Sequence, residues 1–154
     1  MAVSRQKTVI EFKVAGVAET HARTKLACRD LASVIDEPVA RGGTNGGFTP
    51  TETIVAALIG CTNVIASRIS EKMGLHVEGM AIDATAQFDR RGVMLEEELA
   101  VPFPEITLNI SCRTNASAAQ IEQWKSDLAK YCPIAKVIRR SGTTITEHWS
   151  ISPL

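Results

Sequence analysis

The feature of this sequence that most constrains the fold is an apolar stretch that predicts one long helix between Thr49 and Gly74. Thr49 and Glu52 form a Thr-x-x-Glu capping box, and Pro50 occupies the first helical position. About 24 residues at 1.5 Å per residue give a helix roughly 36 Å long. Residues 54–61 are apolar on almost every side, so we expect burial on several sides. One chain of 154 residues covers such a helix with difficulty, and we therefore expect an obligate homodimer.

The segments around this helix carry β-strand and helix patterns. Strands are expected at residues 8–14, 23–28, 31–35, 77–88, 93–99, 105–113 and 143–152. Further helices are expected from the Ser117 capping box to Tyr131, and from Pro133 to Arg140. This order predicts an α+β fold with mostly antiparallel sheet, in a single domain that spans residues 1–154.

Composition argues against several classes of function. The 17 Lys and Arg residues balance the 17 Asp and Glu residues, so no net charge favours nucleic acid or a membrane surface as partner. The uncharged stretch 54–67 is too short and too polar to span a bilayer, and no leader pattern occupies residues 1–13. We therefore expect a cytoplasmic protein. The three histidines are dispersed and no Cys-x-x-Cys occurs, so neither a metal site nor a cofactor is expected.

Two of the four cysteines lie in unusual surroundings. Cys61 falls within the long apolar helix, where free cysteine commonly serves as a small core residue. Cys132 directly precedes Pro133 at an expected helix N-terminus, where the helix dipole favours a thiolate. Local reasoning makes Cys132 the more acidic thiol, although an ordinary cysteine at a helix junction would look the same. Cys28 and Cys112 are expected to be structural residues that take no part in a reaction.

Two polar features near the start of the long helix also allow more than one interpretation. Glu52 has a structural role in the capping box. It precedes Cys61 by nine residues, which puts it half a turn out of phase and roughly 13.5 Å away along the axis. Glu52 could therefore act only on the thiol of a second subunit. The glycine-rich segment 41–48 lacks the ending of a phosphate-binding loop, and a flexible loop beside a site is expected there.

Several motifs together resemble the OsmC/Ohr family, the osmotically inducible and organic hydroperoxide resistance proteins. The resemblance covers residues 42–68 and 127–138, and it rests on Gly43-Thr44-Asn45, Thr49-Pro50-Thr51-Glu52, Ala56-Ala57, Gly60-Cys61 and Tyr131-Cys132-Pro133-Ile134. It implies an OsmC-like α+β fold with a long buried central helix, in an intertwined homodimer with active sites at the interface. One position departs from the peroxidase pattern: Thr51 follows the motif proline, and the acid comes one residue later at Glu52.

The resemblance also implies a thiol peroxidase that acts on organic and inorganic hydroperoxides. Cys61 matches the attacking cysteine and Cys132 the resolving cysteine, which would form a disulfide with it. A dithiol, such as a lipoyl group on a protein, would then reduce that disulfide. Glu52 is the candidate for the acid, one residue after the position that the family pattern uses. Arg23 is the first candidate for the arginine that activates the thiolate, with Arg41 as its rival. The alternative is an OsmC-like ligand-binding or redox-sensing protein without efficient peroxidase activity.

Overall fold

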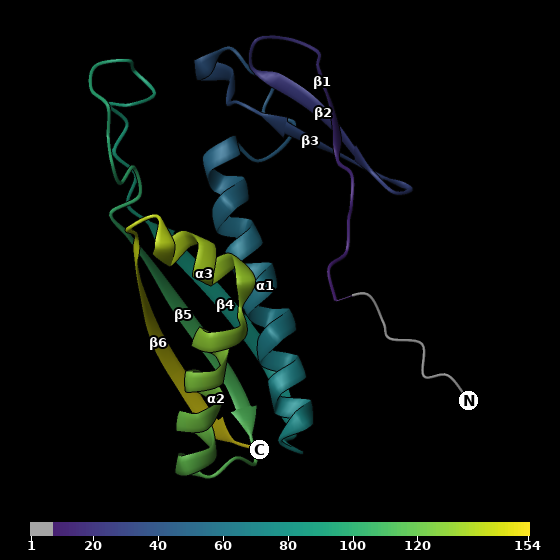
Figure 1. Cartoon of the computed structure of the whole chain (residues 1–154), viewed down its shortest axis with the longest axis vertical. Coiled ribbons are helices and arrows are strands. Elements are labelled where there is room, and N and C mark those ends of the chain that lie inside the picture. The colour runs from purple at the N-terminus through teal and green to yellow at the C-terminus, as the bar shows by residue number, and fades with distance from the viewer. Residues whose placement is uncertain (1–7) are drawn as a thin grey trace. The chain divides into compact units, whose positions relative to one another are not determined.

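The computed structural model describes residues 8–154, and the chain divides into two compact units. The first unit is Met1–Thr53 and the second is Ile54–Leu154. Each has its own three-stranded sheet (Figure 1).

The first unit is an antiparallel sheet followed by a loop. Its strands are β1 (Ala15–Ala18), β2 (Arg23–Cys28) and β3 (Leu31–Asp36), paired in that order. A two-residue turn joins β2 to β3, and Arg29 in it has a φ of 57°, as tight hairpin turns require. The 3₁₀ helix η1 (Val39–Arg41) opens the glycine-rich loop, which ends where Phe48 bridges to Ile35.

The prediction of a strand at residues 8–14 is wrong, because the first strand lies instead at Ala15–Ala18. A strand forms only beside a partner, and the register of β1 with β2 begins at Ala15 opposite Ala27. The apolar side chains that suggested the earlier strand remain exposed, including Val9 at 83% and Phe12 at 78%.

The second unit packs helices on one face of a mixed sheet. Its elements are most of α1 (Pro50–Lys72), then β4 (Val77–Ala86), β5 (Glu105–Thr114), α2 (Ala118–Tyr131), α3 (Pro133–Arg140) and β6 (Thr144–Pro153). β5 lies between β4 and β6, antiparallel to β4 and parallel to β6. A parallel pair needs a crossover, and α2 and α3 provide it by passing over the sheet (Figure 1). Three of the four strand pairings are antiparallel, so the expected α+β fold is confirmed.

The strand expected at residues 93–99 is also wrong, because the connection between β4 and β5 contains turns in its place. Backbone bonds from Met94 to Arg90 and from Leu95 to Gly92 close successive turns. The side chain of Arg91 pairs with Asp89 on one side and Glu97 on the other. These local contacts hold the segment in turns rather than in a strand paired with β4.

The core of the second unit lies between its sheet and its helices. Alternate side chains of β5 point into it, namely Ile106, Leu108, Ile110 and Cys112, as the alternation predicts. Trp124 of α2 is fully buried, and its Nε1 donates to the carbonyl oxygen of Ala66 on α1 at 2.8 Å. This bond fixes α2 against α1, because a buried indole N–H without an acceptor would cost free energy.

Within one chain, α1 buries a single stripe of side chains, which comprises Leu58, Thr62, Ala66, Ile69 and Ser70. Ile54 and Val64 on the same helix remain 45% and 47% exposed. The expected burial on several sides is therefore incomplete in the single chain. By length and composition, the whole of α1 is long and apolar enough to cross a membrane, although its uncharged part alone is not. Helices at the core of globular proteins share this property.

Candidate active site

Cys61 and Cys132 lie side by side although 71 residues separate them in the sequence. The Sγ atom of Cys132 donates a hydrogen bond to the Sγ atom of Cys61 across 3.2 Å. Both residues belong to the second unit, where Cys61 is on α1 and Cys132 joins α2 to α3. A disulfide has an S–S length of about 2.0 Å, so a shift of little more than an ångström separates this pair from a bond.

The local sequence explains how Cys132 reaches this position. Pro133 cannot continue α2 and serves instead as the first residue of α3. Cys132 is therefore both the C-cap residue of α2 and the N-cap residue of α3, with an extended backbone at φ −69° and ψ 108°. Its N–H closes α2 by donating to Leu128, and its carbonyl accepts from Lys136 in α3. The fixed bend holds its side chain in the core, fully shielded from solvent.

The charge state of Cys132 differs from the sequence-based expectation. Burial raises the pKa of its thiol, the N–H of Ala135 lowers it by less, and the neighbouring Cys61 raises it further. Desolvation thus outweighs the helix N-terminus, and Cys132 keeps its proton at neutral pH. That proton is the one donated to Cys61, whose side chain is only partly buried. Solvent and small solutes therefore reach Cys61 rather than Cys132.

Glu52 is engaged in the predicted capping box. Its carboxylate accepts from the N–H of Thr49 at 2.8 Å, while the Thr49 hydroxyl accepts from the N–H of Glu52 at 3.2 Å. These bonds, together with the charge of Arg41, lower the pKa of Glu52. The carboxylate is therefore ionised at neutral pH, and its capping role is confirmed.

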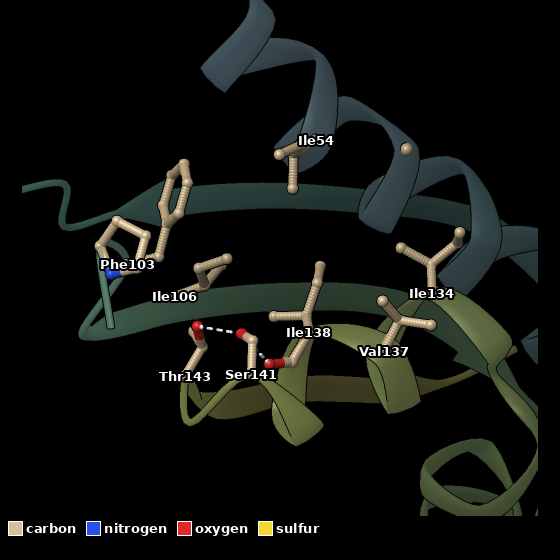
Figure 2. Close-up of a pocket in the computed structure, with 10 residues that line it drawn as sticks. Ile54, Phe103, Ile106, Ile134, Val137, Ile138, Ser141 and Thr143 are labelled. Carbon is tan, nitrogen blue, oxygen red and sulfur yellow. Dashed lines mark hydrogen bonds between the residues drawn. The ribbon is translucent and has the colours of Figure 1, made fainter. Parts of the chain in front are cut away.

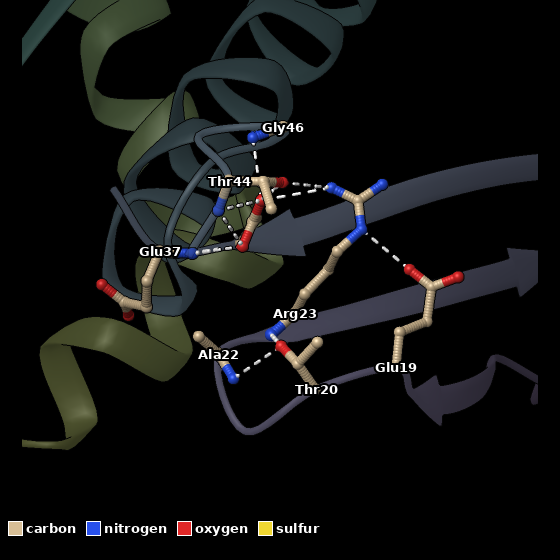
Figure 3. A network of polar contacts seen from close by, with 8 residues as sticks. Glu19, Thr20, Ala22, Arg23, Glu37, Thr44 and Gly46 are labelled. Carbon is tan, nitrogen blue, oxygen red and sulfur yellow. Dashed lines mark hydrogen bonds and ion pairs between the residues drawn. The ribbon is translucent and has the colours of Figure 1, made fainter. Parts of the chain in front are cut away.

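Arg23 is held in a polar network of the first unit (Figure 3). Its Nε donates to Glu19 at 2.8 Å, and its Nη1 donates to Asp36 at 3.1 Å and to Thr44 at 2.9 Å. The bond to Glu19 does most to raise the pKa of Arg23. Its rival Arg41 pairs with Glu37 at 2.6 Å. Both arginines and Glu52 belong to the first unit, so their roles towards Cys61 stay predictions.

The centre of that network is Asp36, which the sequence analysis did not single out. Its fully buried carboxylate accepts hydrogen bonds from the backbone N–H groups of Glu37, Thr44 and Gly46. The hydroxyl of Thr44 adds a bond of 2.5 Å, the largest cause of a strongly lowered pKa for Asp36. An aspartate that ends a strand before a glycine-rich loop is a known turn signal, and it could have indicated this anchor.

A cavity of about 390 Å³ lies among residues of the second unit (Figure 2). Its walls are mostly apolar and include Ile54, Ala57, Phe103, Ile106, Ile134 and Ile138. Two hydroxyl groups, on Ser141 and Thr143, also line it. The sequence analysis did not foresee this cavity, because its walls come from three segments that are far apart in the sequence, 54–57, 102–106 and 134–143. Within residues 8–154, no group of three or more His, Cys, Asp or Glu side chains is placed to hold a metal ion.

Comparison with known proteins places this fold and these motifs in one family. The model of OsmC-like proteins matches residues 43–148, although no curated protein matches the sequence. The structure of an OsmC-like protein from Mycoplasma pneumoniae superposes with a TM-score of 0.77 at 14% identity, over 93% of this chain and 98% of that one.

Two structures of proteins named for organic hydroperoxide resistance have the same fold. The Legionella pneumophila protein superposes with a TM-score of 0.61 at 13% identity, over 95% of this chain and 99% of that one. The Bacillus subtilis protein superposes with a TM-score of 0.59 at 16% identity, over 92% of this chain and 98% of that one. Since the family model spans most of the sequence and the fold agrees over nearly all of it, the chain belongs to the family of OsmC-like proteins.

Proposed function

We propose that this chain is a cysteine-based thiol peroxidase that reduces organic and inorganic hydroperoxides. The observation that carries the proposal is the 3.2 Å approach of the Cys61 and Cys132 sulfur atoms. An accessible thiol beside a buried, protonated one suits a division into attacking and resolving cysteines. Family membership and the hydroperoxide resistance proteins among the structural relatives support the same reaction class.

The proposed catalytic cycle has three steps. The Cys61 thiolate attacks the distal oxygen of the hydroperoxide, so an S–O bond forms, the O–O bond breaks, and the alkoxide takes a proton from water to leave as an alcohol. The Cys132 thiol then condenses with the sulfenic acid of Cys61, which yields a disulfide and releases water. Finally an external dithiol, for which we propose a lipoyl group on a protein, reduces the disulfide by thiol exchange and is itself oxidised to a cyclic disulfide.

We further propose that the working unit is a cytoplasmic homodimer. Thiols stay reduced in the cytoplasm, as the catalytic cycle requires. Exposed apolar side chains on α1 and before β1, among them Val64 and Phe12, are the surface that a second copy would cover. In such a dimer, the ionised Glu52 would act at the thiol of the partner subunit, because Glu52 and Cys61 occupy opposite sides of one helix. Arg23 or Arg41 would activate the Cys61 thiolate.

The test is rapid mixing of the reduced protein with one equivalent of cumene hydroperoxide. We expect loss of two thiols and a Cys61–Cys132 disulfide, identified by mass spectrometry of a non-reduced digest. Cys61→Ser should abolish the reaction, Cys132→Ser should stop at the sulfenic acid, and Cys28→Ser is the matched control that should react normally. If Cys61→Ser reduces peroxide at the native rate, the proposal fails. In that case, saturable binding of an apolar ligand would favour the OsmC-like binding protein instead.

A further inference from the structure

The segment that contains Cys132 and α3 carries an excess of positive charge. Over the whole chain, the 17 Lys and Arg residues balance the 17 Asp and Glu residues. Between Asp127 and Glu147, however, the chain has no acidic residue. The same segment contains four basic residues, namely Lys130, Lys136, Arg139 and Arg140. The excess lies beside the thiol pair, because Cys132 caps α3 and contacts Cys61.

Two of these four cations are neutralised and two are not. Lys130 and Arg139 each pair with one of the flanking carboxylates, at 3.3 Å and 2.9 Å. Lys136 and Arg140 are exposed, and within residues 8–154 neither forms an ion pair. The negative end of the α3 dipole accounts for a cation in the last turn, such as Arg140, but Lys136 lies before that turn. Helix stability therefore does not account for the charge of Lys136.

Lys136 and Arg140 lie on the side of α3 that faces away from the core. They are four residues apart, so their side chains are neighbours on one face of the helix. Val137 is exposed next to them, whereas Ala135 and Ile138 are buried in the core. We call Lys136, Val137 and Arg140 the outer face of α3, and Figure 1 shows this helix lying over the sheet. An apolar side chain beside two free cations suits contact with an acidic protein surface.

The outer face of α3 begins one helical turn from the thiol pair. The N–H of Lys136 donates to the carbonyl oxygen of Cys132 at 3.1 Å, and Arg140 follows about 6 Å further along the helix axis. At about 0.1 M salt, charges are screened over roughly 10 Å, so these cations act on a molecule that approaches the sulfur atoms. Cys132 is fully shielded and Cys61 is partly exposed, so an external thiol reaches Cys61 rather than Cys132.

The small size of this charged surface indicates which kind of partner fits it. Nucleic acids and anionic membranes are bound by larger clusters of basic residues than two. A protein that reduces the disulfide has to approach it once in every catalytic cycle and then leave again. Complementary charges at the rim of a contact mainly speed the encounter, so two free cations suit such a transient partner.

We propose that the outer face of α3 is the docking surface for the protein that reduces the Cys61–Cys132 disulfide, and that this protein has acidic side chains around its dithiol. The inference rests on the proposed peroxidase function and specifies the partner of the same site. A thiolate of the docked reductant attacks Cys61 Sγ, the S–S bond breaks, and Cys132 leaves as a thiolate that takes a proton from water. The second thiol of the reductant gives its proton to solvent and attacks the mixed disulfide, which releases the Cys61 thiolate and the reductant as a cyclic disulfide.

The experiment measures reduction of the disulfide by three synthetic peptides. Each peptide carries a dihydrolipoyl-lysine, and the residues that flank it are all glutamate, all glutamine or all lysine. The full-length protein is first converted to the disulfide with diamide, and the second-order rate of its reduction is measured by quenched flow. We expect the glutamate peptide to react at least about tenfold faster than the lysine peptide at about 10 mM salt. The two rates should come within about twofold of each other at about 1 M salt, where screening removes the attraction.

Charge reversal at the docking surface provides the decisive comparison. In Lys136→Glu combined with Arg140→Glu, the lysine peptide should react faster than the glutamate peptide. Each rate is divided by the rate with the glutamine peptide, so that any effect of the substitutions on the sulfur atoms cancels. Lys25→Glu combined with Arg90→Glu is the matched control, because it changes the net charge equally at two exposed residues that form no ion pair in the described part of the chain. The control should keep the native order of the peptides.

The outcomes separate the docking surface from the function on which it rests. Equal rates for the three peptides at low salt, or the native order in the protein reversed at Lys136 and Arg140, would overturn the docking surface. Inversion of the order in the control protein would also overturn it, since net charge alone would then explain the preference. If the peptides behave as expected but no hydroperoxide oxidises Cys61, the peroxidase proposal fails and the docking surface for an acidic dithiol protein stands.

Discussion

At Cys132 two physical effects act on one thiol in opposite directions. The N-terminus of α3 favours the thiolate, while complete burial favours the protonated form, and burial has the larger effect on the pKa. The resulting proton lies between two sulfur atoms 3.2 Å apart. The two thiols therefore differ in reactivity, because Cys61 is partly exposed to solvent whereas Cys132 is buried and protonated.

Alkylation should reveal this difference. With iodoacetamide at pH 8, we expect Cys61 to react at least about tenfold faster than Cys132, because only an accessible thiolate is a good nucleophile. Peptide mass spectrometry over a time course gives both rates. In 6 M guanidinium chloride the two rates should converge, and a native protein in which Cys132 reacts first would contradict the assignment of roles.

The same pKa shift predicts how stability depends on pH. A group whose pKa is raised by folding holds its proton more tightly in the native state, so it stabilises the fold fully below its unfolded pKa of about 8.5. That contribution declines as pH rises from there towards the folded pKa. We expect the free energy of unfolding in urea to fall between pH 8 and pH 10, and to fall less in Cys132→Ser. Equal slopes in the two proteins would show that another group is responsible.

Among the elements, the loop after β3 depends on one carboxylate. Asp36 accepts from two N–H groups of the loop, and folding strongly lowers its pKa. Its contribution to stability is therefore present above the unfolded pKa of about 3.9 and is lost as pH falls below it. We expect Asp36→Asn to lower the midpoint of thermal unfolding by several degrees and to speed tryptic cleavage at Arg41. The exposed Asp30→Asn should change neither, and an unaltered loop in Asp36→Asn would refute the anchoring role.

Elements with their own local signals were predictable from the sequence. The Ser117–Gln120 capping box starts α2 as expected, and the alternation of β5 matches its burial. The strands expected at residues 8–14 and 93–99 did not form, because pairing with a neighbouring strand decides whether such a segment becomes a strand. The approach of Cys61 to Cys132 followed from the resemblance to a family, since no local spacing relates residues on different elements. The pKa of Cys132 was missed because burial is a property of the whole fold.

For the whole molecule, the apolar surface left open by one chain predicts self-association. Val64 on α1 and Phe12 before β1 are exposed, and burying such side chains against a second copy would gain about 25 cal/mol per Å². We expect a dimer at micromolar concentration in sedimentation velocity. Val64→Asp should shift the protein towards monomer, because the interface would have to bury an unpaired carboxylate. Leu154→Asp, at a position 48% exposed compared with 47% for Val64, is the matched control and should leave the dimer intact. A monomeric native protein that still reduces hydroperoxides would contradict both the dimer and any role of Glu52 at a partner's thiol.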